Sequence, residues 1–188
     1  MTKARDLANA GTALTTVSAT ELGYLDGVTS AVQTQINTKA ASASPTLTTP
    51  AVNGGTISDS IVKGLEEDVN VVASAATGTI NLDIATASIW YYTSNATANH
   101  TLNIRYSSGA SLNSVLATGD AITVVWMNTN GTTAYFPNVI QIDGTTVTPK
   151  VPSAITGGNA SSIDVYSFTI IKTASATFTV LESQTKFA

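Results

Sequence analysis

The sequence is poor in the residues that carry most protein chemistry. Cysteine is absent from all 188 residues, and His100 is the single histidine. Disulfides, thiolate nucleophiles and cysteine-ligated metal sites are therefore excluded, so durability must come from another source, such as oligomerisation. Charged residues make up 11% of the chain, well below the roughly 25% of a soluble domain. The lysines and arginines are scattered singly, which leaves no basic patch for a nucleic acid or an anionic membrane.

Long hydrophobic runs are also missing. No apolar stretch approaches the ~20 residues of a membrane span, and residues 1–7 lack the apolar core of a signal peptide. We therefore expect synthesis in a cytoplasm and no membrane insertion. Thr is abundant instead, at about one residue in six, and Thr favours half-buried strands. This composition is typical of an all-β protein.

A helical segment is expected before residue 65. Ser18-Ala19-Thr20-Glu21 and Ser30-Ala31-Val32-Gln33 both fit a capping box, and the second predicts a helix over 31–40. Such a helix is too short to be stable alone. It could pair with copies of itself in a parallel bundle or pack on the β-domain, and the pattern leaves both open. The apolar stripe that would make these contacts consists of Leu22, Leu25, Val28, Val32 and Ile36.

Residues 41–60 are rich in Ser, Thr, Ala, Pro and Gly. Pro45 and Pro50 keep the preceding residues extended. The segment is either a flexible linker or an intertwined stretch in which three chains bury Leu47, Val52 and Ile57 together.

Strand signals recur about every ten residues from Asp68 onward. Asn130-Gly131 and Asp143-Gly144 predict two hairpins, and a third is expected where the last two strands meet. We predict a mainly β fold, in which a short helical and extended stalk precedes an antiparallel, jelly-roll-like β-sandwich. No helix-length segment separates the strands, which argues against a parallel α/β fold. The expected strands span 69–73, 79–84, 88–93, 101–106, 121–127, 132–136, 139–142, 145–148, 163–171 and 176–181.

Catalytic chemistry is not expected. Asp120 and Asp143 stand at turn signals, where Asp is common for backbone reasons, and no carboxylate pair suggests glycoside hydrolysis. His100 has no Gly-x-Ser-x-Gly elbow to serve and is expected to be a surface turn residue. The sequence therefore predicts neither an enzyme nor a metal or cofactor site.

Trp90, Tyr91 and Tyr92 form the sharpest aromatic cluster. Exposed aromatic side chains stack on sugars and anchor partners. In the alternative, alternate members fill the core and the rest cover a subunit interface. Receptor-binding loops are expected at 94–100, 107–120 and 151–162.

The run Glu21-Leu22-Gly23-Tyr24-Leu25-Asp26-Gly27-Val28-Thr29-Ser30, followed by a Gln-rich short helix, resembles a module of bacteriophage tail-fibre and related virion proteins. The stretch from Ser44 to Pro50 is similar to segments that follow this module. The C-terminal half resembles tail-fibre-like proteins of phages infecting cyanobacteria, through the segments 140–144 and 167–172. The module carries no catalytic residues.

This resemblance implies a parallel homotrimer within a phage particle. Residues 1–17 would anchor the chain to other virion proteins, 18–64 would form the trimeric stalk, and 65–188 would be the distal β-domain. A host cell-surface glycan or lipopolysaccharide is the expected ligand. The chain is much shorter than a long tail fibre, so a short tail-associated fibre is expected. The alternative is a head, collar or tail adaptor or decoration fibre without a receptor.

Overall fold

The computed structural model describes residues 3–4, 18, 20, 34, 61, 63–64 and 66–187. The chain divides into two units, Met1–Ser60 and Ile61–Ala188, and only the second is described in detail. Thr20 and Thr34 are helical, as is the pair Lys3–Ala4. The predicted stalk residues Leu22, Leu25, Val28, Val32 and Ile36, and the segment 41–60, lie outside the described residues.

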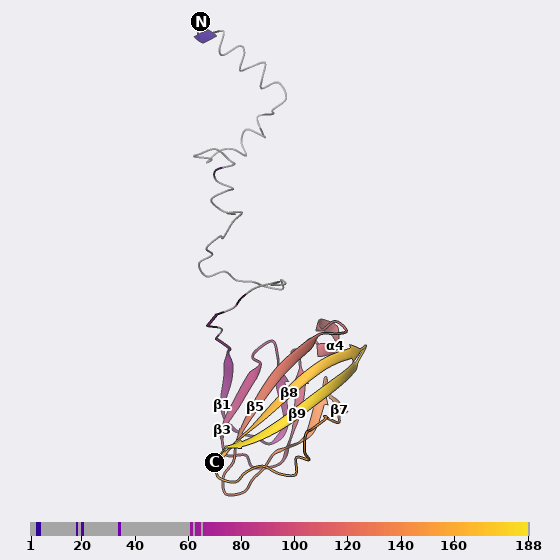
Figure 1. Cartoon of the computed structure of the whole chain (residues 1–188). Coiled ribbons are helices and arrows are strands. Elements are labelled where there is room, and N and C mark those ends of the chain that lie inside the picture. Colours follow the sequence, from indigo (N-terminus) through magenta and orange to yellow (C-terminus); the bar gives the residue numbers. More distant parts are fainter. Residues whose placement is uncertain are drawn as a thin grey trace. The chain divides into compact units, whose positions relative to one another are not determined.

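The described part of the second unit is mainly β, as the composition predicts (Figure 1). Most expected strands form within a few residues of their predicted bounds, because alternating apolar and polar residues suit a half-buried strand. A single helical turn, α4 (Leu112–Val115), is capped by Ser111. The strands are β1 (Val69–Ala75), β2 (Gly78–Asp83), β3 (Ile89–Ser94), β4 (His100–Arg105), β5 (Ala121–Thr129), β6 (Pro137–Ile142), β7 (Thr145–Val147), β8 (Ile163–Ala174) and β9 (Thr177–Phe187).

The strands form two sheets, but their pairing differs from the predicted antiparallel arrangement. One sheet has the order β1-β3-β5-β8-β9 and the other the order β2-β4-β6-β7. Pairing is parallel between β1 and β3, β3 and β5, β2 and β4, and β4 and β6. From β1 to β6 the chain alternates between the sheets, so each strand of one sheet is the connection between two neighbours in the other. The prediction of a wholly antiparallel sandwich was therefore wrong, since parallel strands here need no helical crossover.

The Asn130-Gly131 hairpin does not form. A two-residue type I′ turn needs positive φ at both central residues, and neither Asn130 nor Gly131 has one. The chain instead leaves β5 for the other sheet and resumes as β6, so the expected strand 132–136 is absent. The prediction for Asp143-Gly144 is confirmed, with φ of 51° and 79° and antiparallel pairing of β6 with β7.

The last two strands complete the five-stranded sheet with antiparallel pairs. β8 pairs with β5 over nine positions, from Ala121↔Ile171 to Thr129↔Ile163, and β9 pairs antiparallel with β8. The hairpin expected between the last two strands is therefore confirmed. The two long strands lie beside β5 in Figure 1.

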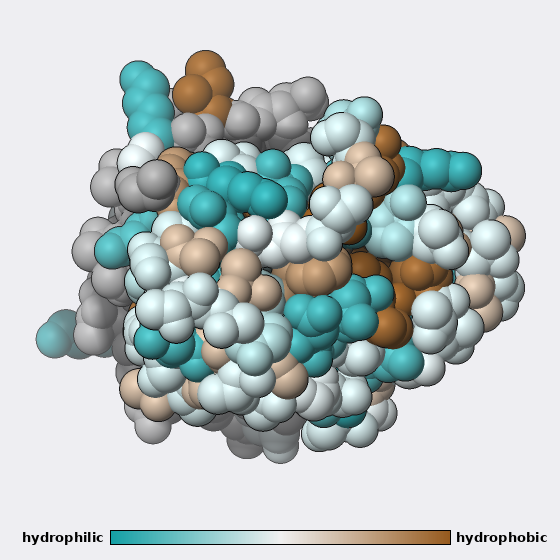
Figure 2. Space-filling model, turned by 90° about the horizontal axis from the view of Figure 1, so that it is seen from below, coloured by the Kyte–Doolittle hydropathy of each residue, from teal (hydrophilic) through white to brown (hydrophobic). Residues whose placement is uncertain are grey.

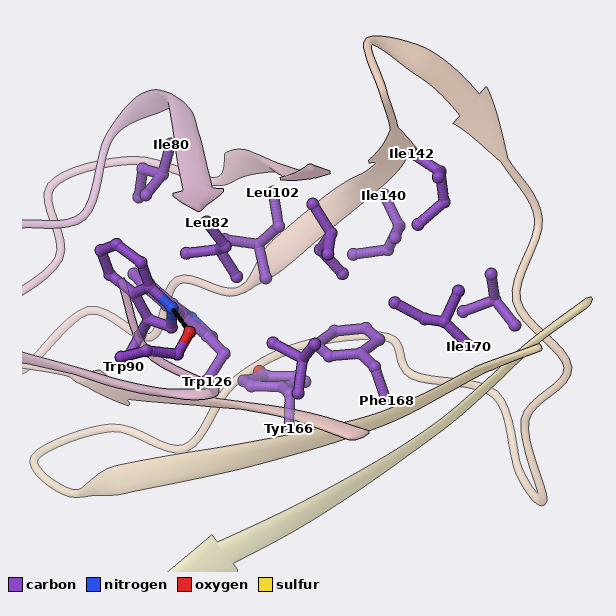
Figure 3. Close-up of a cluster of buried hydrophobic side chains, with 14 of the residues drawn as sticks. Ile80, Leu82, Trp90, Leu102, Trp126, Ile140, Ile142, Tyr166, Phe168 and Ile170 are labelled. Carbon is purple, nitrogen blue, oxygen red and sulfur yellow. Dashed lines mark hydrogen bonds between the residues drawn. The ribbon is translucent and has the colours of Figure 1, made fainter. Parts of the chain in front are cut away.

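The core lies between the sheets and consists of side chains stacked in register (Figure 3). Ile80, Leu102 and Ile140 are neighbours across the four-stranded sheet. Trp90 and Trp126 are neighbours in the five-stranded sheet, and Tyr166 continues the same row. Large buried aromatic and aliphatic groups of this kind supply most of the stability of a chain that has few charges.

Candidate functional site

The strand directions define two ends of the β-domain. β1, β3 and β5 begin at one end, which we call the entry end because Val69 opens the first strand there. They finish at the opposite end, the far end, where β8 begins and β9 finishes. The predicted receptor loops 94–100 and 151–162 belong to the far end, whereas 107–120 belongs to the entry end. The three loops therefore do not form one surface.

The aromatic cluster divides between the two faces of its sheet. Trp90 is buried, and its indole Nε1 donates to the carbonyl of Ala87 at 3.0 Å. Tyr92 packs on Trp126 in the core, with ring centroids 4.6 Å apart. Tyr91 alternates to the outer face and is half-buried. Trp90 and Tyr92 therefore serve packing, and only Tyr91 is placed to meet a partner.

A cavity of about 620 Å³ opens at the far end. Its floor is one register row across β5, β8 and β9, formed by Thr129, Ile163 and Phe187. The loops after β3 and β5 and the loop before β8 supply the rest of the lining, with none of its side chains charged. These loop residues are Asn95, Asn130, Gly131, Thr132, Ser161 and Ser162.

Backbone hydrogen bonds hold these loops together. Ala96 N–H donates to the Thr129 carbonyl at 2.8 Å, and Asn130 N–H donates to that of Ser162 at 2.8 Å. Ser161 N–H donates to the Gly131 carbonyl at 2.6 Å, with Ser161 in the left-handed region at φ 54°. A non-glycine residue held there indicates a conformation imposed by its surroundings. The cavity walls are thus fixed by the chain itself.

The side chains that line the cavity combine polar and apolar chemistry. Phe187 is 54% exposed, so much of its ring is available for contact. The Thr129 hydroxyl is buried without a hydrogen-bond partner. Figure 2 views this end of the domain, where hydrophilic and intermediate side chains dominate and hydrophobic ones gather in a few places. The lining could hold a neutral, hydroxyl-rich ligand that also has an apolar face.

A buried polar network lies directly beneath the cavity. The Asn130 side chain accepts from Asn128 Nδ2 and from Tyr135 N–H, and its own Nδ2 donates to Asp164 Oδ2 at 3.0 Å. Asn159 N–H donates to the same oxygen at 2.7 Å. Burial raises the pKa of Asp164, although these hydrogen bonds oppose the change. The network ties the Asn130 loop to the loop before β8 and so supports the cavity.

His100 is not the surface turn residue that the sequence predicts. It is buried against Trp126, with ring centroids 5.6 Å apart, and its Nδ1 lies 3.2 Å from the carbonyl oxygen of Ala98. Burial lowers the pKa of its imidazole. The prediction failed because His100 opens β4 with the inward parity of Leu102 and Ile104. Its Nε2 is buried without a hydrogen-bond partner among the described residues.

The carboxylates occupy separate structural positions. Asp143 accepts from Leu112 N–H and Asn113 N–H at the start of α4, and Asp120 accepts from Ala117 N–H. Both turn roles agree with the sequence analysis. Asp83 pairs with Arg105 at 2.6 Å. Within the described ranges, no group of three potential metal-binding side chains occurs.

The cavity residues themselves were not predicted as a site. The register of β5, β8 and β9 is what brings together residues that are far apart in the sequence, such as Thr129, Ser161 and Phe187. This register is non-local, and no short motif marks it. The inclusion of 94–100 and 151–162 among the expected loops was the one usable signal.

No family model matches the chain, and no curated protein or solved structure is significantly similar to it. Among the residues that the structure describes, no helix is long and apolar enough to cross a membrane.

Proposed function

We propose that this chain is a structural protein of a bacteriophage virion that forms a short homotrimeric fibre associated with the tail. Its N-terminal region would bind other virion proteins, and its β-domain would contribute to attachment to the host surface. The resemblance of residues 18–50 to phage fibre modules supports the location. The observation that carries the attachment role is the uncharged far-end cavity, which lies at the opposite end of the domain from the first residue of β1.

The cavity chemistry fits a host cell-surface glycan or the polysaccharide of lipopolysaccharide. Hydroxyl and amide groups of Thr132, Ser161 and Asn95 can exchange hydrogen bonds with sugar hydroxyls. The exposed ring of Phe187 can cover the apolar face of a sugar ring. Without a charged group in the lining, nothing there would compensate a buried phosphate or carboxylate. A neutral stretch of polysaccharide is therefore the expected ligand.

The test measures binding of the full chain to an array of bacterial surface polysaccharides and lipopolysaccharides. We expect the unmodified protein to bind at least one of them. Phe187→Ala should lower the affinity about tenfold, because we expect its ring to be the aromatic anchor of the site and loss of such an anchor costs about 1.4 kcal/mol or more. Val115→Ala is the matched control, since Val115 is also exposed but lies in α4 at the entry end.

Two results would contradict the proposal. Equal binding by Phe187→Ala and the unmodified chain would move attachment away from the cavity. Absence of binding to every envelope preparation would remove the attachment role and favour the head, collar or tail adaptor or decoration fibre.

A further inference from the structure

The charged residues of the five-stranded sheet lie on its inward face, among the core side chains, and not on its outward face. Asp164, Lys172 and Glu182 have the inward parity and are buried. The outward positions of the same strands carry no charged residue at all. We call these positions the outer face. The outer face comprises the residues that share the parity of Val71 on β1, Tyr91 on β3, Val125 on β5, Ile171 on β8 and Leu181 on β9, and all of them are apolar residues, Tyr, Thr or Ser.

Exposed large hydrophobic residues concentrate on the outer face. Val69, Val71, Leu181 and Phe187 all belong to it, and Val71 is 60% exposed. They lie on β1 and β9, the two edge strands of the sheet (Figure 1). Half-buried Ile89, Val125, Met127 and Val165 occupy the strands between them. The exposed apolar residues thus flank a centre of half-buried apolar and hydroxyl-bearing side chains, and partly apolar surface without charges is typical of an interaction site.

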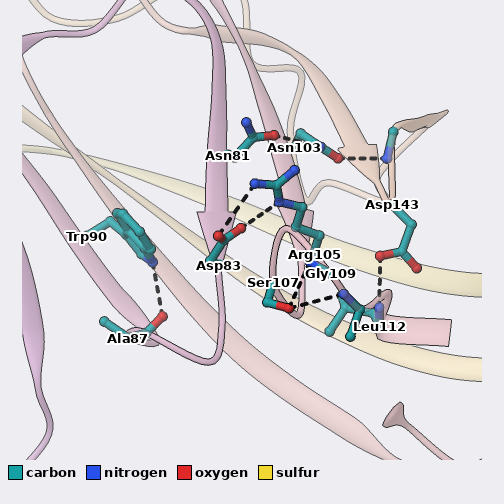
Figure 4. A network of polar contacts seen from close by, with 12 residues as sticks. Asn81, Asp83, Ala87, Trp90, Asn103, Arg105, Ser107, Gly109, Leu112 and Asp143 are labelled. Atoms are coloured by element: carbon teal, nitrogen blue, oxygen red, sulfur yellow. Dashed lines mark hydrogen bonds and ion pairs between the residues drawn. The ribbon is translucent and has the colours of Figure 1, made fainter. Parts of the chain in front are cut away.

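The outer face of the other sheet is built differently. Asn103 Nδ2 donates to Asn81 Oδ1 at 2.8 Å across neighbouring strands, and Arg105 pairs with Asp83 beside them (Figure 4). Gln141 continues the amide row on β6. Polar and charged side chains of this kind suit a sheet that faces water. The four-stranded sheet is therefore suited to face solvent. The five-stranded sheet, whose inward face is already covered by the core, is suited to have its outer face covered as well.

We propose that the outer face of the five-stranded sheet is the surface by which copies of this chain associate. The inference rests on the proposed homotrimer and locates its contact in the β-domain. A second copy of the chain is the favoured occupant. Its own outer face has no charged strand residue, so contact between two outer faces would bury no unpaired charge. A different protein partner would usually be selected by complementary charges. The strand positions of the outer face offer none, and exposed Lys150 is a charged residue at its β9 border.

The size of the outer face agrees with such a contact. Five strands spaced about 4.8 Å apart give a width of ~24 Å, and seven residues at about 3.3 Å each give a length of ~23 Å. The resulting footprint of roughly 550 Å² is flat projected area, and pleated side chains add to it. Each partner in a stable interface buries about 800 Å². The outer face is therefore of the right order for a stable association.

The cavity and the outer face are continuous. Thr129, Ile163 and Phe187, which form the cavity floor, are the last register row of the outer face at the far end. In the proposed parallel homotrimer, association through the more central rows would place the cavities of the copies at the same end of the assembly. Several cavities that engage one polysaccharide would gain effective concentration without any new contact.

The experiment uses the absence of cysteine from the chain. Val71→Cys and Leu181→Cys each place one thiol on the outer face, and Thr79→Cys places one on the exposed outer surface of the other sheet as the matched control. Light scattering gives the mass of each full-length variant, and a maleimide reagent gives the labelling rate of its thiol. At concentrations where the mass equals three chains, we expect the Val71→Cys and Leu181→Cys thiols to react at least tenfold more slowly than the Thr79→Cys thiol.

The outcomes separate the two proposals. Similar labelling rates in a protein with the mass of three chains would overturn the outer-face contact and leave the homotrimer intact. A single-chain mass for the unmodified protein would overturn both. A further variant, Val71→Lys with Leu181→Lys, should lower the mass or raise the concentration at which the oligomer dissociates at least tenfold. The corresponding Thr79→Lys variant should leave both unchanged.

Discussion

Gly158 shows how tightly a single residue can be bound to the network beneath the cavity. A Cβ atom at this position would lie 2.5 Å from the Tyr135 carbonyl oxygen and 2.7 Å from both Asn130 Nδ2 and Asp164 Oδ2. The first contact is with backbone, and the other two are with side chains held by hydrogen bonds. No flexible group can therefore move aside without loss of a contact.

We expect Gly158→Ala to destabilise the β-domain by about 1–3 kcal/mol, the range for overpacked interiors. Gly157→Ala is the control, because a Cβ at Gly157 would meet nothing within 4 Å. Urea unfolding of the two variants measures the difference. Equal stabilities would show that the loop before β8 moves freely and does not support the cavity as described.

Glu182 is a carboxylic acid in an apolar setting. It is 7% exposed on β9, opposite Phe168, and lines a small cavity beside Phe136, Val147 and Ile155. Burial raises the pKa of Glu182 from 4.5 to about 7. The folded protein therefore retains this proton up to about pH 7, whereas the unfolded chain releases it near pH 4.5. The stabilising contribution is complete below pH 4.5, is lost as pH rises to about 7, and changes little above that.

Glu182→Gln removes this titration and keeps the shape of the side chain. Near pH 8 we expect the variant to be more stable than the unmodified protein by up to roughly 3 kcal/mol, from a pKa difference of about 2.5. At pH 4.5 the advantage should almost vanish. Denaturant unfolding at both pH values tests this, with exposed Glu66→Gln as control. An advantage that does not change with pH would mean that Glu182 does not titrate between these values.

At the scale of elements, the local sequence pattern predicts where a strand lies better than it predicts which strand it pairs with. Alternation marks β2 and β4 clearly, because Ile80 and Leu82, like Leu102 and Ile104, share one face. Nothing local shows that β2 and β4 lie side by side and run in the same direction, since β3 intervenes in the chain. Strands β2 and β4 could therefore be predicted from the sequence, but their parallel pairing could not.

The two Asx-Gly turns illustrate the same limit. Both dipeptides favour a hairpin, but only Asp143-Gly144 adopts it, and there Asp143 also accepts two hydrogen bonds from the start of α4. At Asn130 the side chain accepts from Asn128 and Tyr135 and donates to Asp164. Tertiary hydrogen bonds therefore decide which of two equal local signals becomes a turn. The cavity exists because the chain after Asn130 leaves its sheet.

At the scale of the whole molecule, the alternation of strands between two sheets explains why a chain with few charges can be ordered. Each pair of consecutive strands (β1–β2, β3–β4 and β5–β6) adds one strand to each sheet and again places apolar side chains on the inward faces. The four-stranded sheet then ends with β7, which pairs antiparallel with β6. The five-stranded sheet ends with the β8–β9 hairpin, in which β8 pairs antiparallel with β5. The outer face extends across the parallel and the antiparallel strands of its sheet alike.

The parallel register of β2 and β4 can be tested with a disulfide in this cysteine-free chain. Thr79 and Thr101 are register partners on neighbouring strands, so Thr79→Cys with Thr101→Cys should oxidise readily and stabilise the fold by about 3 kcal/mol through loop closure. If the strands ran antiparallel, Thr79 would lie opposite the other end of β4 and no bond would form. Thr79→Cys with Gln141→Cys is the control, because β4 lies between these positions and Gln141 is two residues beyond the register row of Thr79, a separation of ~12 Å that is beyond disulfide reach. Unfolding with and without reductant measures the effect, and a bond in the control pair alone would contradict the topology.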